Sequence, residues 1–71
     1  MTTIQKMQPS IPFAIGQRVE THPATDAWMQ GDRFGEVVGY GQRRAGVAPV
    51  KVLMDRSGRV RRFHPSYLSE V

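Results

Sequence analysis

Apolar and polar positions alternate most clearly in the second half of this chain. Val50, Val52 and Met54 stand at every second position with mixed residues between them, which is typical of a strand that buries one face. Arg59–Phe63 reads as the returning strand. The residues Asp-Arg-Ser-Gly at 55–58 predict a tight hairpin turn between the two, because glycine accepts a positive φ and Asp and Ser can bond the local backbone.

The returning strand is less regular than its partner. Val60 and Phe63 fall on opposite parities, so either a bulge intervenes or Phe63 has already left the ladder. Pro65–Leu68 predicts a single tight helical turn, since proline suits the first helical position. Ser69–Val71 is then long enough to form a final short strand.

Two more strands are predicted in the first half of the chain. Gly16–Thr21 places Val and Thr after a turn residue, and the His22-Pro23 pair ends it because proline removes a ladder donor. Phe34–Tyr40 is the second strand, and Gly35 and Gly39 inside it predict bulges or sharp bends. Because side chains alternate between the two faces of a strand, we expect one face to contain Phe34, Glu36, Val38 and Tyr40.

Two connections separate the predicted strands. In the segment 24–32, Asp26 could cap a helical turn through Trp28, but a short polar stretch that closes at Gly31 favours a structured loop. The segment 41–49 is polar and contains glycine, as expected for a link between neighbouring antiparallel strands.

These elements predict an all-β fold: a small SH3-like antiparallel barrel of about five strands with a short 3-10 turn. The 71 residues allow one domain, which we expect to span 13–71. Residues 1–12 are expected to form a disordered N-terminal arm, because they lack periodic hydrophobicity. The alternation of Ile11, Phe13 and Ile15 predicts either a short strand or an anchor for that arm.

Composition excludes several classes of function. There is no cysteine, so neither a disulfide framework nor a thiolate zinc site is expected, and His22 and His64 lack the close second ligand that a metal site needs. We therefore expect no metal and no cofactor. No stretch is apolar enough for a membrane span and 1–12 lacks a signal pattern, so a cytoplasmic protein without membrane contact is expected.

Positive charge provides the main functional indication. Ten basic residues against six acidic ones give a formal charge of +4, which favours a polyanionic partner but also serves solubility. Alternation puts Arg59 and Arg61 on one face of their strand, where guanidinium groups could follow a phosphate backbone. The predicted nucleic-acid-binding residues are Arg43, Arg44, Lys51, Arg56, Arg59, Arg61 and Arg62. The alternative is a solvated face or a contact with a protein partner or a second copy of the chain.

Aromatic residues and histidines add little chemistry. Trp28 and Tyr40 are candidate contact aromatics that could stack on unpaired bases, although each also suits a core position. His22 and His64 have polar neighbours but no third group that would orient them for acid–base work. We predict no catalytic residue and no enzymatic activity.

The chain from Gly16 to Leu68 resembles the broad SH3-like barrel group that includes KOW and Tudor-like modules. The resemblance rests on a Gly-x-x-Val opening at 16–19, a Gly-x-Val-Val strand at 35–38 and a hairpin that ends in a proline-containing turn. It implies a binding module. The run His22–Val38 looks like that of small proteins in phage and bacterial genomes, which implies a phage or mobile-element origin.

A second resemblance is to the plasmid-borne type II dihydrofolate reductases. It rests on Gly-Gln-Arg-Val at 16–19, a Trp-containing loop, Val-Val-Gly-Tyr at 37–40 and a terminal Pro-x-x-Leu turn. That family implies a tetramer around one pore lined by a Val-Gln-Ile-Tyr motif, which matches 60–63 here. Arg61 and Arg62 replace neutral residues of the motif, and symmetry would crowd their charges around one axis. This departure argues against the reductase activity.

Overall fold

The structure, a computed structural model that describes residues 13–71, is a single antiparallel sheet of five strands with two short helical turns. The elements are β1 (Arg18–Thr21), α1 (Asp26–Met29), β2 (Phe34–Tyr40), β3 (Val50–Met54), β4 (Val60–Phe63), the 3-10 helix η1 (Pro65–Tyr67) and β5 (Leu68–Glu70). The predicted all-β fold, with about five strands and one 3-10 turn, is confirmed. The predicted arm over 1–12 lies outside the described residues.

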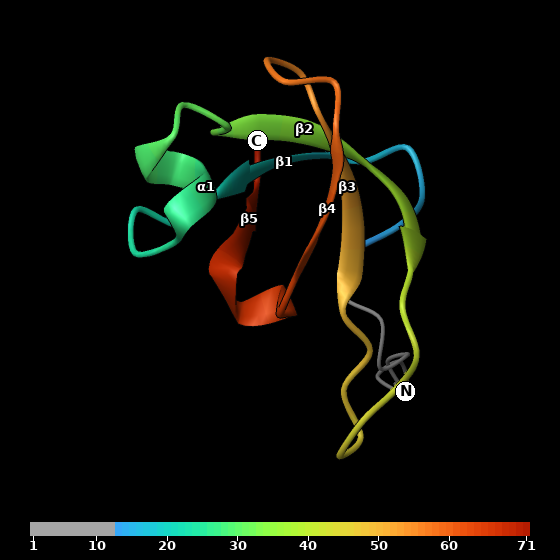
Figure 1. Cartoon of the computed structure of the whole chain (residues 1–71). Coiled ribbons are helices and arrows are strands. Elements are labelled where there is room, and N and C mark those ends of the chain that lie inside the picture. Colours follow the sequence, from blue (N-terminus) through green and yellow to red (C-terminus); the bar gives the residue numbers. More distant parts are fainter. Residues whose placement is uncertain (1–12) are drawn as a thin grey trace, which may run out of the picture.

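The sheet has the order β4-β3-β2-β1-β5 and curls around its apolar side (Figure 1). Consecutive strands pair from β1 to β4, and the chain then returns through η1 so that β5 pairs with the far side of β1. The His22 N–H donates to the Tyr67 carbonyl oxygen at 2.8 Å and fixes this return. Strands β4 and β5 are the two sheet edges, and the loop between them closes one end of the fold.

The core follows the predicted alternation in β1 and β3. Each of these strands turns every second side chain inward, and β3 buries Val50, Val52 and Met54 as expected. Among residues 13–71, the buried apolar core consists of Phe13, Val19, Ala27, Val37, Val50, Val52, Met54, Phe63 and Leu68. Such a small core makes each of these side chains important, since one buried aliphatic group contributes roughly 1.5–3 kcal/mol.

Strand β2 corrects one prediction. The pairing of β2 with β3 shifts between Val37 and Gly39, so Val38 is an extra residue in the ladder. This bulge turns Tyr40 to the core side, and the expectation that Tyr40 shares a face with Phe34 is wrong. Gly35 is no bulge: a Cβ there would lie only 2.5 Å from the Val52 Cγ1 atom, so glycine permits close packing of β2 on β3.

The structure of the segment 24–32 also differs from the one predicted from the sequence. We expected a loop, but Asp26–Met29 forms one helical turn, and its N-cap is Thr25 rather than Asp26. The Thr25 hydroxyl accepts a hydrogen bond from the Trp28 N–H at 3.2 Å, which satisfies a donor that a four-residue helix leaves open. Burial of Ala27 holds the turn against the core. Tertiary packing therefore stabilises a helix that is too short to be stable alone.

The irregular returning strand has a simple explanation. Phe63 pairs with Val50 in an unbroken β3–β4 ladder, so neither a bulge nor an early exit occurs. Val60 and Phe63 stand at positions of opposite parity because they lie on opposite faces of β4. Phe63 faces the core, whereas Val60 faces outward and is 55% exposed. An exposed valine in a small domain is ordinary, whereas the sequence pattern alone treats it as a core residue.

Candidate functional site

The hairpin between β3 and β4 ends in a tight four-residue turn at one end of the molecule. The Met54 N–H donates to the Arg59 carbonyl oxygen at 2.9 Å, and the Gly58 N–H donates back to the Met54 carbonyl oxygen at 3.0 Å. Gly58 has a φ of 71°, a conformation that glycine adopts without strain. The predicted turn at 55–58 is confirmed.

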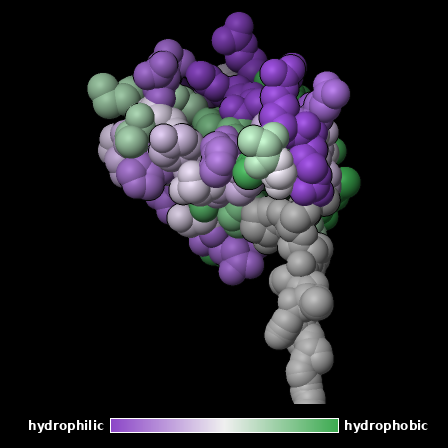
Figure 2. Space-filling view, turned by 90° about the horizontal axis from the view of Figure 1, so that it is seen from below, coloured by the Kyte–Doolittle hydropathy of each residue, from purple (hydrophilic) through white to green (hydrophobic). Residues whose placement is uncertain are grey.

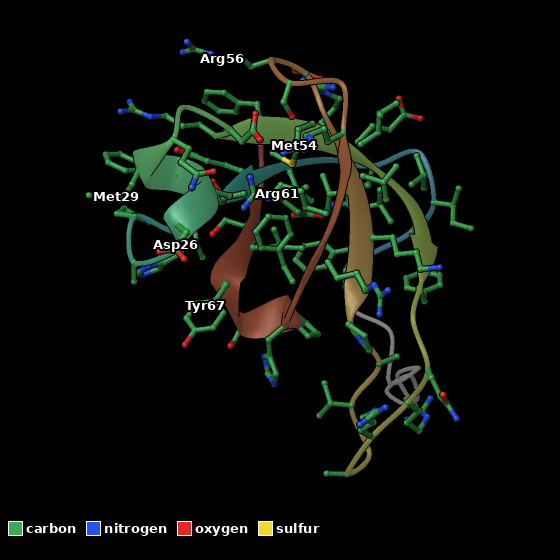
Figure 3. All side chains as sticks on the ribbon, in the orientation of Figure 1. Asp26, Met29, Met54, Arg56, Arg61 and Tyr67 are labelled. Carbon is green, nitrogen blue, oxygen red and sulfur yellow. The ribbon has the colours of Figure 1, made fainter. Side chains whose placement is uncertain are left out.

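Asp32 holds this hairpin to the connection between β1 and β2. The Asp32 residue is 3% exposed, and its Oδ2 atom accepts hydrogen bonds from Ser57 Oγ at 2.9 Å and from Arg61 Nη1 at 3.2 Å. The Arg61 Nη1 atom also donates to Gln30 Oε1 at 3.1 Å. The Arg61 charge is thus compensated within the chain, and Arg61 positions the hairpin against α1 (Figure 3).

A second arginine stacks on the aromatic residue of α1. The Arg33 Cζ atom lies 3.8 Å from the Trp28 ring centroid, a cation–π contact that fixes both side chains. Arg33 was not among the residues predicted from the sequence. It lies outside the basic hairpin, and the only sequence signal was its position shortly after Trp28 and Gly31.

Arg56 extends from the hairpin tip toward the same region. Its guanidinium packs over Gly31, where an added Cβ would come 2.6 Å from the Arg56 Nη1 atom. Arg59 follows the turn, is exposed, and shares the parity of Arg61, whose side chain points to α1. Figure 3 shows Arg56 at the opposite end of the molecule from Tyr67. We call Trp28, Arg33, Arg56 and Arg59 the hairpin-tip surface.

The remaining predicted basic residues lie elsewhere. Arg43 and Arg44 belong to the 41–49 loop, which extends from the other end of the fold (Figure 1), and the Arg43 Nη1 atom donates to the Gly46 carbonyl oxygen at 3.0 Å. Lys51 and Arg62 are register partners on the outer face of the sheet. With Arg61 bound to Asp32 and Arg56 and Arg59 at the hairpin tip, the structure therefore divides the seven predicted residues among four places instead of joining them in one surface.

The two candidate aromatics also differ in position. Trp28 is half-buried and borders the surface, whereas Tyr40 packs against the core. The Tyr40 hydroxyl donates a hydrogen bond to the Phe13 carbonyl oxygen. Tyr40 thus ties the start of the described chain to β2, whereas Trp28 contacts the exposed Arg33 side chain.

Arg18 and Asp55 form a two-pronged ion pair across the outer side of β2. The Arg18 Nη1 atom donates to Asp55 Oδ1 at 2.9 Å, and Nη2 donates to Oδ2. The hydrogen bond from Arg18 lowers the pKa of Asp55 below its ordinary value of 3.8, and the same bond raises the pKa of Arg18. Asp55 therefore stays ionised at neutral pH and remains bound to Arg18.

Both histidines serve local turns. The Nδ1 atom of His22 accepts from the Ala24 N–H at 2.9 Å, and the Nδ1 atom of His64 accepts from the Ser66 N–H at 3.1 Å. Each imidazole also contacts the Tyr67 ring edge-on. Within residues 13–71 there is no group of three metal-ligating side chains.

Figure 2 views the end of the molecule opposite the hairpin tip, where hydrophilic residues predominate and hydrophobic ones form small separate areas. No helix of the described chain has the length and apolar character needed to cross a bilayer.

Comparison with known proteins gave no matching family model, no matching curated protein and no matching solved structure.

Proposed function

We propose that this protein is a binding module that contacts nucleic acid through the hairpin-tip surface. The observation that carries the proposal is that Arg33 stacks on Trp28, while Arg56, which packs over Gly31, and the exposed Arg59 belong to the hairpin turn held against the same connection. The ion pairs of residues 13–71 are Arg18 with Asp55 and Arg61 with Asp32, so these three arginines keep their positive charge uncompensated by a carboxylate. Guanidinium groups in such a cluster can each bind a phosphate.

The geometry around Trp28 supports unpaired bases as the preferred ligand. Arg33 covers one face of the half-buried indole, so a base would stack on the exposed Arg33 guanidinium plane or on the remaining ring surface. Each base stacked on an aromatic ring contributes about 1–3 kcal/mol to binding. Arg33 keeps the indole in one orientation, so little side-chain entropy is lost on binding. A flexible single strand can bring both a base and its flanking phosphates to this small surface.

Fluorescence anisotropy with labelled single-stranded and duplex oligonucleotides tests the proposal. Binding should weaken as salt rises, with a slope in log salt of about 0.7 per phosphate contact for a single strand. Arg56→Gln and Arg59→Gln should each reduce that slope by roughly one contact and weaken binding to every sequence. Trp28→Leu should weaken single-strand binding with the slope unchanged, because stacking releases no counterions.

Arg44→Gln is the matched control, since it removes the same charge from the opposite end of the fold. If the contacts are local, the affinity of Arg44→Gln for the oligonucleotides should stay within about twofold of that of the unmodified protein. The remaining difference reflects the loss of one long-range charge attraction. Equal losses in Arg44→Gln and Arg56→Gln would mean that charge alone drives binding and would reject the hairpin-tip surface. No binding at low salt would reject the nucleic-acid role altogether.

A protein-interaction module is the second candidate function. It is favoured by large apolar side chains that the sheet leaves exposed on its outer face.

We propose binding rather than catalysis, because the Nδ1 atoms of His22 and His64 both accept hydrogen bonds from backbone N–H groups in local turns. Calorimetry with a nicotinamide cofactor tests whether the resemblance to the type II reductases extends to their activity. Absence of binding would exclude reductase activity.

A further inference from the structure

The outer face of β2, β3 and β4 carries large apolar side chains that the fold does not cover. Four residues make up this outer apolar patch: Phe34, Val38, Leu53 and Val60, with exposed fractions of 43, 39, 39 and 55%. Single exposed apolar residues are common, but several on one side of a sheet indicate an interaction surface.

The register of the sheet brings these side chains together. Leu53 is paired directly with Val60 on one side and with Glu36 on the other. Phe34 and Val38 flank Glu36 along β2, and all three lie on its outer side because the alternation of β2 is regular as far as Val38. The patch therefore spans three strands, with Leu53 at its centre and Glu36 beside it.

Two cations border the patch without a carboxylate partner within the described chain. Lys51 and Arg62 are directly opposite each other on β3 and β4, an arrangement of like charges that destabilises a strand pair. Neither takes part in the ion pairs of the described chain. Glu36 makes no ion pair either, but it is the direct register partner of Arg18 on β1, and its negative charge acts on that guanidinium. One face thus contains an uncompensated pair of cations and, on a neighbouring strand, a carboxylate that shares Arg18 with Asp55.

We propose that this face is an interface between two copies of this chain. When two identical faces meet around a twofold axis, each contact occurs twice, so Glu36 of one copy can approach Lys51 or Arg62 of the other in both directions. The apolar patches then cover each other in the centre, and the cations gain the carboxylate that they lack within one chain.

A nucleic acid is a poorer occupant of this face. Glu36 lies within the patch beside Leu53, and Asp55 on its border holds Arg18 in an ion pair. A phosphate backbone crossing the patch would approach these carboxylates, whereas a second copy supplies cations to them. The hairpin-tip surface uses Arg33, Arg56 and Arg59, so the two proposals rest on different residues and can fail separately.

Sedimentation equilibrium on nuclease-treated protein tests the interface. We expect a reversible monomer–dimer equilibrium, and Leu53→Lys should raise the dimer dissociation constant at least about tenfold by placing a charge in the apolar centre. Met29→Lys is the matched control, because Met29 is 76% exposed but lies on α1, away from this face. A thermal melt verifies folding, and Val60→Lys replaces Leu53→Lys if that variant does not fold.

A charge exchange identifies the partner as a second copy. Glu36→Lys alone and Lys51→Glu alone should each weaken self-association, because like charges then meet twice. An equal mixture of the two variants should associate again, since both cross-interface pairs become attractive in the mixed dimer. Arg62→Glu replaces Lys51→Glu in a second mixture, because Glu36 can meet either cation.

Three results would overturn the proposal. The first is a monomer at all concentrations up to about the millimolar range, which corresponds to less than roughly 4 kcal/mol of association free energy. The second is an equal effect of Leu53→Lys and Met29→Lys. The third is a dimer that nuclease treatment abolishes, which would show nucleic acid bridging the copies and would agree with the proposed function alone.

Discussion

The Arg61 guanidinium lies 3.2 Å from the buried Asp32 carboxylate and ties the β3–β4 hairpin to the connection that carries α1. Ser57 donates to the same Asp32 oxygen at 2.9 Å, so one carboxylate fixes both the tip and the returning strand. This pair explains why Arg56 at the hairpin tip packs over Gly31, in the connection that follows α1. Arg61 is a positioning residue, although its place among the hairpin arginines had indicated a ligand contact.

Asp32→Ala should destabilise the protein by about 2 kcal/mol, because Arg61 and Ser57 lose their shared acceptor in a largely buried site. Urea denaturation followed by Trp28 fluorescence measures this change. Asp26→Ala removes an exposed carboxylate from α1 and should change stability by no more than about 0.5 kcal/mol. Equal midpoints for the two variants would show that the Asp32 contacts contribute nothing special.

Gly35→Ala should be strongly destabilising. The new Cβ would lie 2.5 Å from Val52 Cγ1 and 2.6 Å from the Leu53 carbonyl oxygen, and the backbone atom cannot move without breaking the ladder. A cost of about 2–3 kcal/mol is expected from overpacking. Gly39→Ala is the control in the same strand, because the nearest atom to its Cβ is the Lys51 Cδ at 3.9 Å. Thermal melts of both variants should separate clearly.

Thr25→Ala should cost about 1 kcal/mol through loss of the helix cap at α1. The Thr25 hydroxyl accepts from the Trp28 N–H at 3.2 Å and donates to the His22 carbonyl oxygen at 2.7 Å. Thr25→Ser keeps the hydroxyl and should retain most of the stability. Denaturant midpoints of the two variants test the cap, and a serine variant as unstable as the alanine one would contradict it.

The Arg18–Asp55 pair predicts a pH dependence of stability. Because Arg18 lowers the folded-state pKa of Asp55, the pair stabilises the fold above the ordinary pKa of 3.8 and this contribution disappears as pH falls through the folded-state pKa. The Tm difference between the unmodified protein and Asp55→Asn should be constant above about pH 5 and shrink toward zero in acid. A difference that persists unchanged at low pH would contradict the assignment to this ion pair.

The sequence by itself determined the strands and the turn that joins two of them. Alternating Val50, Val52 and Met54 required one buried face, and the Asp-Arg-Ser-Gly segment at 55–58 required a tight turn. These are local rules, which depend on a few neighbouring residues, so no tertiary information was needed. Phe34–Tyr40 was predicted with its observed bounds for the same reason.

Only the tertiary structure decided where the charges act. The Arg61 partner, Asp32, lies 29 positions away in the sequence. Arg33 meets Trp28 because the chain turns back after α1, where the Asp32 N–H donates to the Ala27 carbonyl oxygen at 2.8 Å. Whether a strand arginine faces a carboxylate or water depends on which loop packs against it. The sequence therefore predicted a basic hairpin, and folding separated it into an internal anchor, a hairpin-tip surface and an outer face, because burial and ion pairing are set by contacts between distant segments.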